Sequence, residues 1–592
     1  SQGVRDTVHL DRQGDLRRSH PATEVTATLV GQEVTVMGWA HSHRDHGGLI
    51  FVDLRDRSGV VQVVFDREDT PETHGRAEEI RSEFVIAARG RVRRRAPEDV
   101  NPKLPTGEIE IEASELRILN GAVPPPFPIE DDPGVDEQIR LRHRIHDLRR
   151  PAFQRTLEMR HRAYQSFRQS LVERDFLEIE TPMLAKATPE GARDFLVPSR
   201  LHEGEFYALP QSPQIMKQLL MISGYERYFQ IARCFRDEDL RADRQFEFTQ
   251  VDLEMSFVGV EDVLEVLEDV TVRVWSEAGG VELERPFPRM SYDEAMARFG
   301  IDRPDTRISL ELVDLTDIFT DSEFRAFRGV VDSGGIVKCL PVHDAGELSR
   351  GDLDRLESFV RKELGAKGLA WIKVNEDGWQ GPIVKFLSEA EKSAITARTD
   401  VRPGSLVFFQ ADAFEQANAV LARLRVDIGE RLGRTDGRAW APLLVLDFPL
   451  FERTEDGKLT YMHMPFVAPL DDDLEKLEDS PGSVRATHYD VVMNGTELGS
   501  GSLRNHRADV QRRILEVMGY AKDEMESQFG FLLNALEAGA PPHGGFAFGF
   551  DRVVMLLAGT DNLRDVNAFP KTQRGQVLLM DSPTAIDRDQ LD

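Results

Sequence analysis

Cysteine is nearly absent from this chain, since Cys234 and Cys339 are the only two among 592 residues. Two cysteines exclude a disulfide framework and a cysteine-based zinc site. The chain also contains no apolar run of transmembrane length, and its polar N-terminus lacks the apolar core of a signal peptide. We therefore expect a soluble, cytoplasmic protein without a membrane partner.

Basic residues are outnumbered by acidic ones, and the formal net charge is −29. This excess does not exclude a nucleic-acid partner, because phosphates are bound by local patches of lysine and arginine. The length of 592 residues predicts about three or four domains, each large enough to bury a core.

Short β-strand patterns separated by Gly, Asp and Pro fill the sequence from Glu33 to Leu119. Five such strands predict a small closed barrel of the OB-fold type, which we place at 21–125, after an N-terminal extension, 1–20, expected to be poorly ordered. An exposed Phe51 would stack on an unpaired base, with Gln62 and Arg44 beside it for hydrogen bonds and phosphate. Spacing alone favours Phe51 as an ordinary core residue.

A proline-rich segment, 122–134, cannot form regular structure, and an arginine-rich segment, 138–151, follows it. We interpret 126–152 as a linker and hinge that can contact an RNA backbone or solvent. Helical spacing of apolar residues then predicts an amphipathic helix from Phe153 to about Glu173. Residues 303–440 mix helix and strand patterns without clusters typical of a site, which predicts an inserted α+β domain.

The stretch from Arg227 to Met255 alternates apolar and polar residues on both sides of a densely charged segment. This pattern predicts two antiparallel strands joined by a long charged loop. Arg236 lies where the first strand ends, and its guanidinium can face a phosphate and a carboxylate together. A solvated helix with an Asp237–Arg241 pair accounts for the same pattern about equally well.

Several other polar residues stand in positions suited to binding. Gln214 and Lys217 are three apart at the start of a predicted helix and therefore share a face. Glu190 lies in a glycine-flanked loop. Taken alone, His463 is more often a satisfied loop histidine than a functional one. Further along the chain come two acids, two glycines that would let a ligand approach the backbone closely, and two arginines: Asp490, Glu497, Gly499, Gly501, Arg504 and Arg552.

Three strings in this order, FLEIETPML, FRDE…FEFTQVDLEM and GGFAFGFDR, resemble the signature motifs of class II aminoacyl-tRNA synthetases. With the N-terminal barrel, the chain resembles the aspartate/asparagine/lysine subgroup. The strings TPEGARDF, ALPQSPQ, YMHMPF and GAPPHGG are similar to those of bacterial-type aspartyl-tRNA synthetases. The resemblance spans about 33–572 and implies an α+β multidomain fold. In this fold, 153–302 and 441–592 form an antiparallel-sheet catalytic domain, with 303–440 inserted.

The resemblance implies an aspartate–tRNA ligase that uses ATP and Mg²⁺. Such an enzyme activates L-aspartate to aspartyl-adenylate and transfers it to the 3′ end of tRNA-Asp. A carboxylate is already nucleophilic at neutral pH, so positioning and charge stabilisation suffice for the first step. A homodimer is implied as well, with Pro182 and the preceding helix in the subunit contact.

The site residues follow from the same resemblance. Those implied for aspartate are Glu190, Gln214, Lys217, Arg236, His463 and Arg504. Those implied for ATP are Arg236, Asp237, Glu238, Gln245, Glu497, Gly549, Phe550, Asp551 and Arg552. Asp490 and Glu497 are hard oxygen ligands suited to Mg²⁺. Arg236, Arg552 and Glu497 would be catalytic. Arg44, Phe51 and Gln62 would read the anticodon, which reverses the preference for Phe51 as core.

Some positions depart from the family pattern. Met464 stands where a second histidine is usual, Ser500 interrupts the glycine run, and His46 leaves open whether tRNA-Asn is also charged. Two further alternatives are a non-catalytic, synthetase-like RNA-binding protein and an asparaginyl enzyme. Lys217 with Arg504 favours a substrate carboxylate over an amide.

Overall fold

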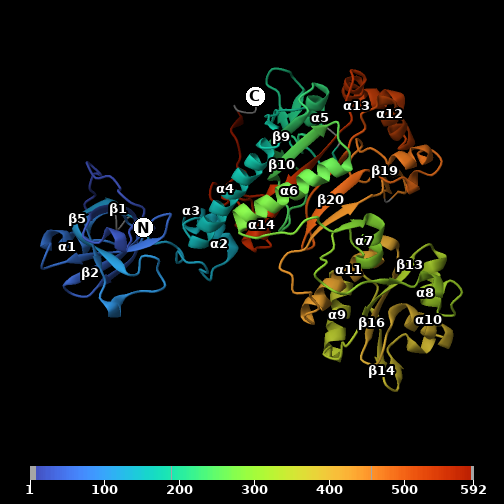
Figure 1. Cartoon of the computed structure of the whole chain (residues 1–592), viewed down its shortest axis with the longest axis horizontal. Helices are drawn as coiled ribbons and strands as arrows, with labels where there is room; N and C mark the ends of the chain where they lie inside the picture. The colour runs from blue at the N-terminus through green and yellow to red at the C-terminus, as the bar shows by residue number, and fades with distance from the viewer. Residues whose placement is uncertain (1–7, 188–189, 455, 589–592) are drawn as a thin grey trace. The chain divides into compact units, whose positions relative to one another are not determined.

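Residues 8–187, 190–454 and 456–588 are described by the structure, a computed structural model of the chain (Figure 1). The chain divides into two compact units, Ser1–Arg160 with Asn562–Asp592, and His161–Asp561. In the described ranges, no helix combines the length and apolar character needed to cross a membrane.

The first unit contains a closed barrel with strand order β1-β2-β3-β5-β4. Its strands are β1 (Glu33–Asp45), β2 (Leu49–Arg55), β3 (Val60–Asp66), β4 (Val85–Arg94) and β5 (Ile109–Asn120). Alternation along β2 buries Ile50, Val52 and Leu54 in the barrel core and leaves Phe51 half-buried. Helix α1 (Pro71–Ala77) and the 3-10 turn η3 (Pro97–Asp99) complete the barrel domain. The predicted OB-type barrel is confirmed.

The N-terminal extension is not poorly ordered where the structure describes it, so that prediction is wrong for residues 8–20; residues 1–7 lie outside the described ranges. Leu16 is fully buried. The backbone N–H of Asp11 donates to Ile118 O at 2.8 Å, and that of Ser19 donates to Thr35 O at 2.9 Å. The polar composition of this segment gives no indication of its order, because backbone hydrogen bonds form without apolar side chains. Two short 3-10 turns, η1 (Ala22–Glu24) and η2 (Ala27–Leu29), lead into β1.

The proline-rich segment 122–134 contains no helix or strand, as predicted. After it come α2 (Glu137–Arg142), α3 (Arg144–Asp147) and the predicted long helix, α4 (Pro151–Val172). Arg144 is buried and donates to the carbonyl oxygens of Arg564 and Asn567 at 2.8 and 2.7 Å. This arginine of the hinge therefore ties two distant segments together rather than facing RNA or solvent. The turn η8 (Leu563–Asp565) belongs to the same unit.

The second unit is built on an eight-stranded sheet with order β11-β17-β20-β21-β22-β10-β9-β6. The strands are β6 (Leu177–Glu178), β9 (Arg227–Phe235), β10 (Glu247–Ser256), β11 (Arg289–Ser291), β17 (Pro442–Leu446), β20 (His488–Met493), β21 (Thr496–Leu503) and β22 (His543–Gly549). All central pairs are antiparallel, and only the two end pairs are parallel. The predicted hairpin is β9–β10, so the helical alternative for this stretch is wrong.

One face of this sheet is apolar and packs on helices, because alternate residues of each strand point the same way. Phe167 of α4, for example, meets Phe548 of β22 edge to face, with ring centroids 5.1 Å apart. The helices of this unit outside the insertion are α5 (Gln214–Ile222), α6 (Val260–Gly279), α7 (Tyr292–Phe299), α12 (Ala508–Val517), α13 (Lys522–Glu537) and α14 (Phe550–Ala558). The loops of this unit contain two small hairpins, formed by β7 (Leu196–Pro198) with β8 (Phe206–Ala208) and by β18 (Phe451–Arg453) with β19 (Leu459–Tyr461). They also contain two 3-10 turns, η6 (Asp471–Lys476) and η7 (Pro481–Ser483).

A second, five-stranded sheet, order β12-β13-β16-β14-β15, lies within the segment predicted to be inserted. Its strands are β12 (Val313–Asp314), β13 (Ile336–Val342), β14 (Ala370–Asn375), β15 (Gly378–Gln380) and β16 (Leu406–Asp412). Helices α8 (Arg325–Asp332), α9 (Arg350–Lys362), α10 (Glu389–Thr399) and α11 (Phe414–Arg431) accompany it, with η4 (Thr316–Phe319) and η5 (Val384–Phe386). Leu340 and Phe408 belong to one core and Cys339 and Phe409 to another, so the sheet has an apolar core on each face.

Candidate active site

Strand register places two neighbouring rows of residues across one face of the large sheet. In order over β20, β21, β22, β10 and β9, the first row is His488, Ser502, Gly545, Glu254 and Tyr228. The second row is Asp490, Ser500, Ala547, Asp252 and Gln230. Side chains two apart on a strand share a face, so both rows face the same side of the sheet. Polar groups far apart in the sequence therefore line one surface.

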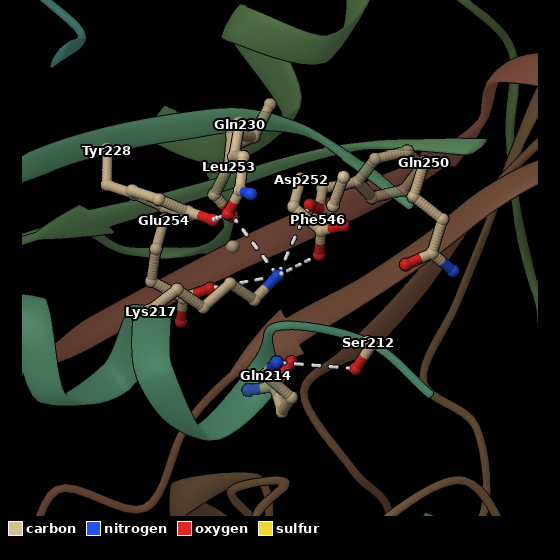
Figure 2. A network of polar contacts seen from close by, with 12 residues as sticks. Ser212, Gln214, Lys217, Tyr228, Gln230, Gln250, Asp252, Leu253, Glu254 and Phe546 are labelled. Atoms are coloured by element: carbon tan, nitrogen blue, oxygen red, sulfur yellow. Dashed lines mark hydrogen bonds and ion pairs between the residues drawn. The ribbon is translucent and has the colours of Figure 1, made fainter. Parts of the chain in front are cut away.

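Helix α5 carries Lys217 onto these rows (Figure 2). Its Nζ lies 3.0 Å from Asp252 Oδ1 and 3.3 Å from Glu254 Oε2. Arg504 reaches the other oxygen of Glu254, with Nε 3.0 Å from Oε1. All four side chains are buried. The two cations that the sequence predicts together do meet, and two acids accompany them.

The local sequence pattern does not mark those two acids, Asp252 and Glu254, as site residues, although both stand in the QVDLEM string at alternate positions. Burial raises the pKa of Asp252, and the nearby ammonium of Lys217 only partly offsets that effect. Burial also acts on Glu254, but Arg504 and Lys217 together outweigh it and lower the pKa of that carboxyl. With both acids ionised, the cluster of Lys217, Asp252, Glu254 and Arg504 carries no net charge.

A glycine is required beneath this buried cluster. A Cβ built on Gly545 would lie 2.0 Å from Glu254 Oε2 and 2.2 Å from Leu253 O. Neither neighbour can retreat, because the carboxylate is ion-paired and the carbonyl belongs to the sheet. Part of the glycine-rich string near the C-terminus therefore allows β22 to approach a carboxylate closely.

Gln214 begins α5, and Glu190 is linked to that end of the helix through Ser212. Ser212 Oγ donates to Glu190 Oε2 at 2.6 Å and accepts the backbone N–H of Gln214 at 3.3 Å. The Gln214 side chain donates to Gln218 Oε1 at 3.0 Å. Glu190 and Ser212 line a cavity of about 260 Å³, bounded by Met216 and other residues of α5.

His463 follows β19, and its ring stacks on that of His488 with centroids 3.5 Å apart. Burial lowers the pKa of His463 to about 4, so the imidazole is neutral at physiological pH. The next residue, Met464, places its Sδ 3.8 Å from Arg504 Nη1. The loop with the departure from the usual histidine pair thus contacts the buried cluster directly.

Arg236 directly follows the last residue of β9, Phe235. Within the described residues its guanidinium makes no ion pair, and its buried Nε has no hydrogen-bond partner. The guanidinium lies over the ring of Phe248, 4.9 Å from the centroid. Asp237 and Glu238, next along the chain, are engaged by Arg193 at 2.6 Å and Arg244 at 3.4 Å. The buried Gln245 closes the charged loop just before β10.

Arg552 stands in the first turn of α14, three residues after Gly549 ends β22. Its Nη1 donates to Glu497 O at 3.2 Å, and its Nη2 lies 3.8 Å from Asp243 Oδ2 in the charged loop. Asp551 accepts the backbone N–H of Thr249 at 2.8 Å. Phe550 stacks on Tyr164 with centroids 3.9 Å apart. Asp551 and Phe550 thus anchor α14, while Arg552 faces the charged loop.

Asp490 and Glu497 lie on the antiparallel strands β20 and β21. The pKa of Asp490 is raised well above its usual range by burial, then by the nearby charges of Glu497 and Asp302. A divalent cation would relieve this crowding of carboxylates. In the described part of the chain, no group of three or more metal-ligating side chains comes together. Two carboxylates suit Mg²⁺, which keeps several waters and takes phosphate oxygens as its other ligands.

In the barrel, Arg44 and Gln62 form one hydrogen-bonded set. Arg44 Nη2 donates to Gln62 Oε1 at 3.0 Å and to Asp53 Oδ1 at 3.1 Å. Gln62 is buried, and its amide donates to Glu110 Oε2 at 2.7 Å. Gln62 therefore orients Arg44 rather than presenting a free amide. Phe51 is half-buried and has the His46 ring at its edge, 5.5 Å away.

Comparison with known families identifies two matching regions. Residues 136–573 match the family described as class II tRNA synthetases (D, K and N). Residues 34–119 match the family described as OB-fold nucleic acid binding domains. The two matches together cover most of the chain.

Curated relatives match nearly the full length. The chain is 52% identical over 584 residues to the aspartate–tRNA(Asp/Asn) ligase of Desulfosudis oleivorans, covering 98% of each chain. It is 51% identical over 588 residues to the enzyme of the same name from Syntrophotalea carbinolica, again covering 98% of each.

Solved structures with a similar fold include asparaginyl-tRNA synthetase from Pyrococcus horikoshii in complex with asparaginyl-adenylate. Its TM-score is 0.59 at 18% identity, over 94% of this chain and 98% of that one. Aspartyl-tRNA synthetase from Entamoeba histolytica gives 0.58 at 18% identity, over 95% of this chain and 94% of that one. At this identity the likeness shows the fold alone.

Proposed function

We infer that this chain, which belongs to the class II aminoacyl-tRNA synthetases of the aspartate, lysine and asparagine group, is an aspartate–tRNA ligase. The observation that carries the substrate assignment is the pair of buried cations, Lys217 and Arg504, on one polar face. Two buried cations favour a carboxylate side chain, and they disfavour both a lysine and an uncharged amide.

In the proposed complex, the side-chain carboxylate of aspartate binds beside Lys217 and Arg504, and Glu190 with Gln214 faces the α-ammonium. Asp252 and Glu254 hold the two cations in place before substrate arrives. They also balance the two cations, so the ammonium and the guanidinium are available to an anion without the large cost of burying unpaired cations. His463, neutral because of burial, adds a hydrogen-bonding group and no charge.

ATP would lie along the strand ends that carry Arg236 and Arg552, with Gln245 and Glu238 near the nucleotide. The unengaged guanidinium of Arg236 is free to bridge the α-carboxylate of aspartate and the α-phosphate. Arg552 would exchange its long contact with Asp243 for the γ-phosphate. Asp490 and Glu497 would hold Mg²⁺, which neutralises phosphate charge when bound.

The reaction has two steps. The α-carboxylate attacks the α-phosphorus in line, and pyrophosphate leaves to give aspartyl-adenylate. The 3′-terminal hydroxyl of tRNA then attacks the carbonyl of this mixed anhydride, and AMP leaves. Arg236 stabilises the charge on the α-phosphate in both steps, so catalysis comes from positioning and preorganised cations.

The tRNA range is the finer part of the proposal. The relatives named above are aspartate–tRNA(Asp/Asn) ligases, and the barrel places His46 against Phe51. We propose that Arg44 and Phe51 bind the anticodon, with the buried Gln62 orienting Arg44, and that tRNA-Asn is accepted along with tRNA-Asp. Aminoacylation of each purified tRNA tests this, and background charging of tRNA-Asn would limit the enzyme to tRNA-Asp.

A homodimer is the proposed assembly. Strand β6 lies at the edge of the large sheet, and Leu177 on it is 50% exposed. Met183 and Leu184, just after Pro182, are 38% and 50% exposed. Apolar side chains on and beside an open strand edge are typical of an interface. Sedimentation of a monomer at micromolar concentration would contradict the proposal.

ATP–pyrophosphate exchange tests the activity directly. We expect exchange with aspartate and only background with asparagine or lysine. Arg236→Ala and Arg552→Ala should abolish it. Arg233→Ala is the matched control, because Arg233 lies on β9 three residues before Arg236 and is paired with Glu247 at 2.7 Å. Absence of exchange in the unmodified protein would favour a non-catalytic RNA-binding role.

A further inference from the structure

Three aromatic rings meet at the start of β20. His463 and His488 are stacked, with centroids 3.5 Å apart and planes inclined by 16°. Phe448 meets both edge to face, at 5.1 Å from His463 and 4.9 Å from His488. His488 thus fixes the ring of a residue assigned above to the aspartate pocket, although nothing in the proposed reaction uses His488 itself.

The edge of the His488 ring is as constrained as its face. Its Nε2 lies 2.9 Å from Asp490 Oδ1, and the two side chains are 3% and 4% exposed. Its Nδ1 is buried without a hydrogen-bond partner among the described residues. A side chain placed only to fill space would not bring two ring nitrogens into a dry interior, because such atoms lose their water.

The two neighbours of His488 belong to different halves of the site. His463 precedes Met464, whose Sδ lies 3.8 Å from Arg504 Nη1, on the amino-acid side. Asp490 lies near Glu497, whose backbone oxygen accepts from Arg552, on the nucleotide side. His488 is therefore in contact with one residue of each half.

We propose that His488 is a positioning residue that joins the two halves of the site: its face orients His463 for aspartate, and its edge orients the Asp490 carboxylate for Mg²⁺ with ATP. The inference rests on the proposed function, because it assigns the two halves to these ligands. It requires no charge change on His488, since an Nε2–H donor serves the carboxylate in the neutral ring.

Two substitutions separate the two contacts. His488→Phe keeps a flat ring for His463 and removes the nitrogen that meets Asp490. His488→Gln keeps an amide N–H at the end of a side chain of similar reach and removes the stacked ring. Binding by calorimetry is the readout, with L-aspartate as one probe and the β,γ-methylene analogue of ATP with Mg²⁺ as the other.

His488→Phe should leave aspartate binding within about 2-fold and weaken binding of the Mg²⁺–nucleotide by about 10-fold or more, as expected for a lost hydrogen bond to a charged group. His488→Gln should show the opposite pattern, with aspartate weakened by about 3- to 10-fold, as for a lost aromatic pair. Equal shifts for both ligands in both variants, or none, would overturn the proposal.

The controls separate this inference from the function it rests on. His74 is buried as well, at 2% exposed, but lies in the barrel domain. His74→Gln should therefore change neither the affinity for aspartate nor that for the Mg²⁺–nucleotide. If the unmodified protein binds neither ligand, the proposed function fails and the inference with it. Unmodified binding with parallel losses in the variants rejects the inference alone. Melting temperatures show whether each variant folds. If His488→Phe or His488→Gln fails to fold, His488→Asn takes its place, and unchanged binding of both ligands by His488→Asn would also overturn the proposal.

Discussion

Replacing Lys217 by methionine tests whether the buried charges are balanced as the structure indicates. Methionine keeps most of the volume of the lysine stem and removes the ammonium. Asp252 and Glu254 would then share a single cation, Arg504, in a place where all of these side chains are at most 3% exposed. One buried acid would be left without compensation.

The expected cost is large because removing one partner from a buried ion pair typically costs about 3–5 kcal/mol. The distances support the full value, since Lys217 Nζ contacts both acids, at 3.0 and 3.3 Å. Adding Asp252→Asn to Lys217→Met restores the balance, leaving Glu254 with Arg504. We expect the double variant to recover most of the loss, to within about 1.5 kcal/mol, on the order of one broken hydrogen bond.

Hydrogen–deuterium exchange is the suitable assay, because a chain of several domains has no single free energy of unfolding. Amides of β10 should exchange about 10²- to 10⁴-fold faster in Lys217→Met, corresponding to 3–5 kcal/mol of easier local opening. Peptides from the barrel, in the other unit, are the internal control and should not change. Equal losses in the single and double variants would refute the balance of charges, as would unchanged exchange in Lys217→Met.

Three further outcomes are expected. The pKa of His463 falls from 6.5 to about 4 on folding, so the stability that the neutral imidazole contributes is complete above pH 6.5 and is lost as the pH falls toward 4, about 3 kcal/mol in all. After correction for the slower intrinsic exchange at low pH, the protection of amides in the loop around His463 should therefore fall between pH 7 and 5, but not in His463→Gln. Asp243→Asn should lower KM for ATP by up to about 5-fold, because it removes one of the two long ion pairs of Arg552, a partly exposed pair worth less than about 1 kcal/mol, and leaves the pair with Glu497. An unchanged KM for ATP in exchange assays would contradict this. Phe51→Ala should raise KM for tRNA by about 5- to 150-fold, the value of one lost base stack, and leave pyrophosphate exchange unchanged.

Much of the fold follows from local patterns in the sequence. Alternation gave the β9–β10 hairpin, and helical spacing gave α4, because both periods are properties of a single segment. The N-terminal segment around Leu16 was mispredicted, since its order comes from hydrogen bonds to Thr35 and Ile118 elsewhere in the chain. Such pairing leaves no local pattern.

In the candidate site, too, some residues can be predicted from a local pattern and others depend on contacts between distant segments. Arg236 could be singled out because it ends a strand before a charged loop. The acids Asp252 and Glu254 could not, since alternating polar residues on a strand usually face solvent, and only the register with β22 and the position of α5 bury them. The pairing of Gln62 with Glu110 joins β3 to β5 across the barrel and is equally invisible to local reasoning.

Strand register makes this site sensitive to a particular kind of genetic change. A single-residue deletion in β21 or β22 would turn Ser500 and Ser502, or Gly545 and Ala547, toward the helices and bring Phe546 or its neighbours among the charges. A point substitution alters one position and leaves the register of all other residues in the sheet unchanged. Variation in such an enzyme should therefore accumulate by replacement within these strands, with gained or lost residues confined to the loops and the inserted domain.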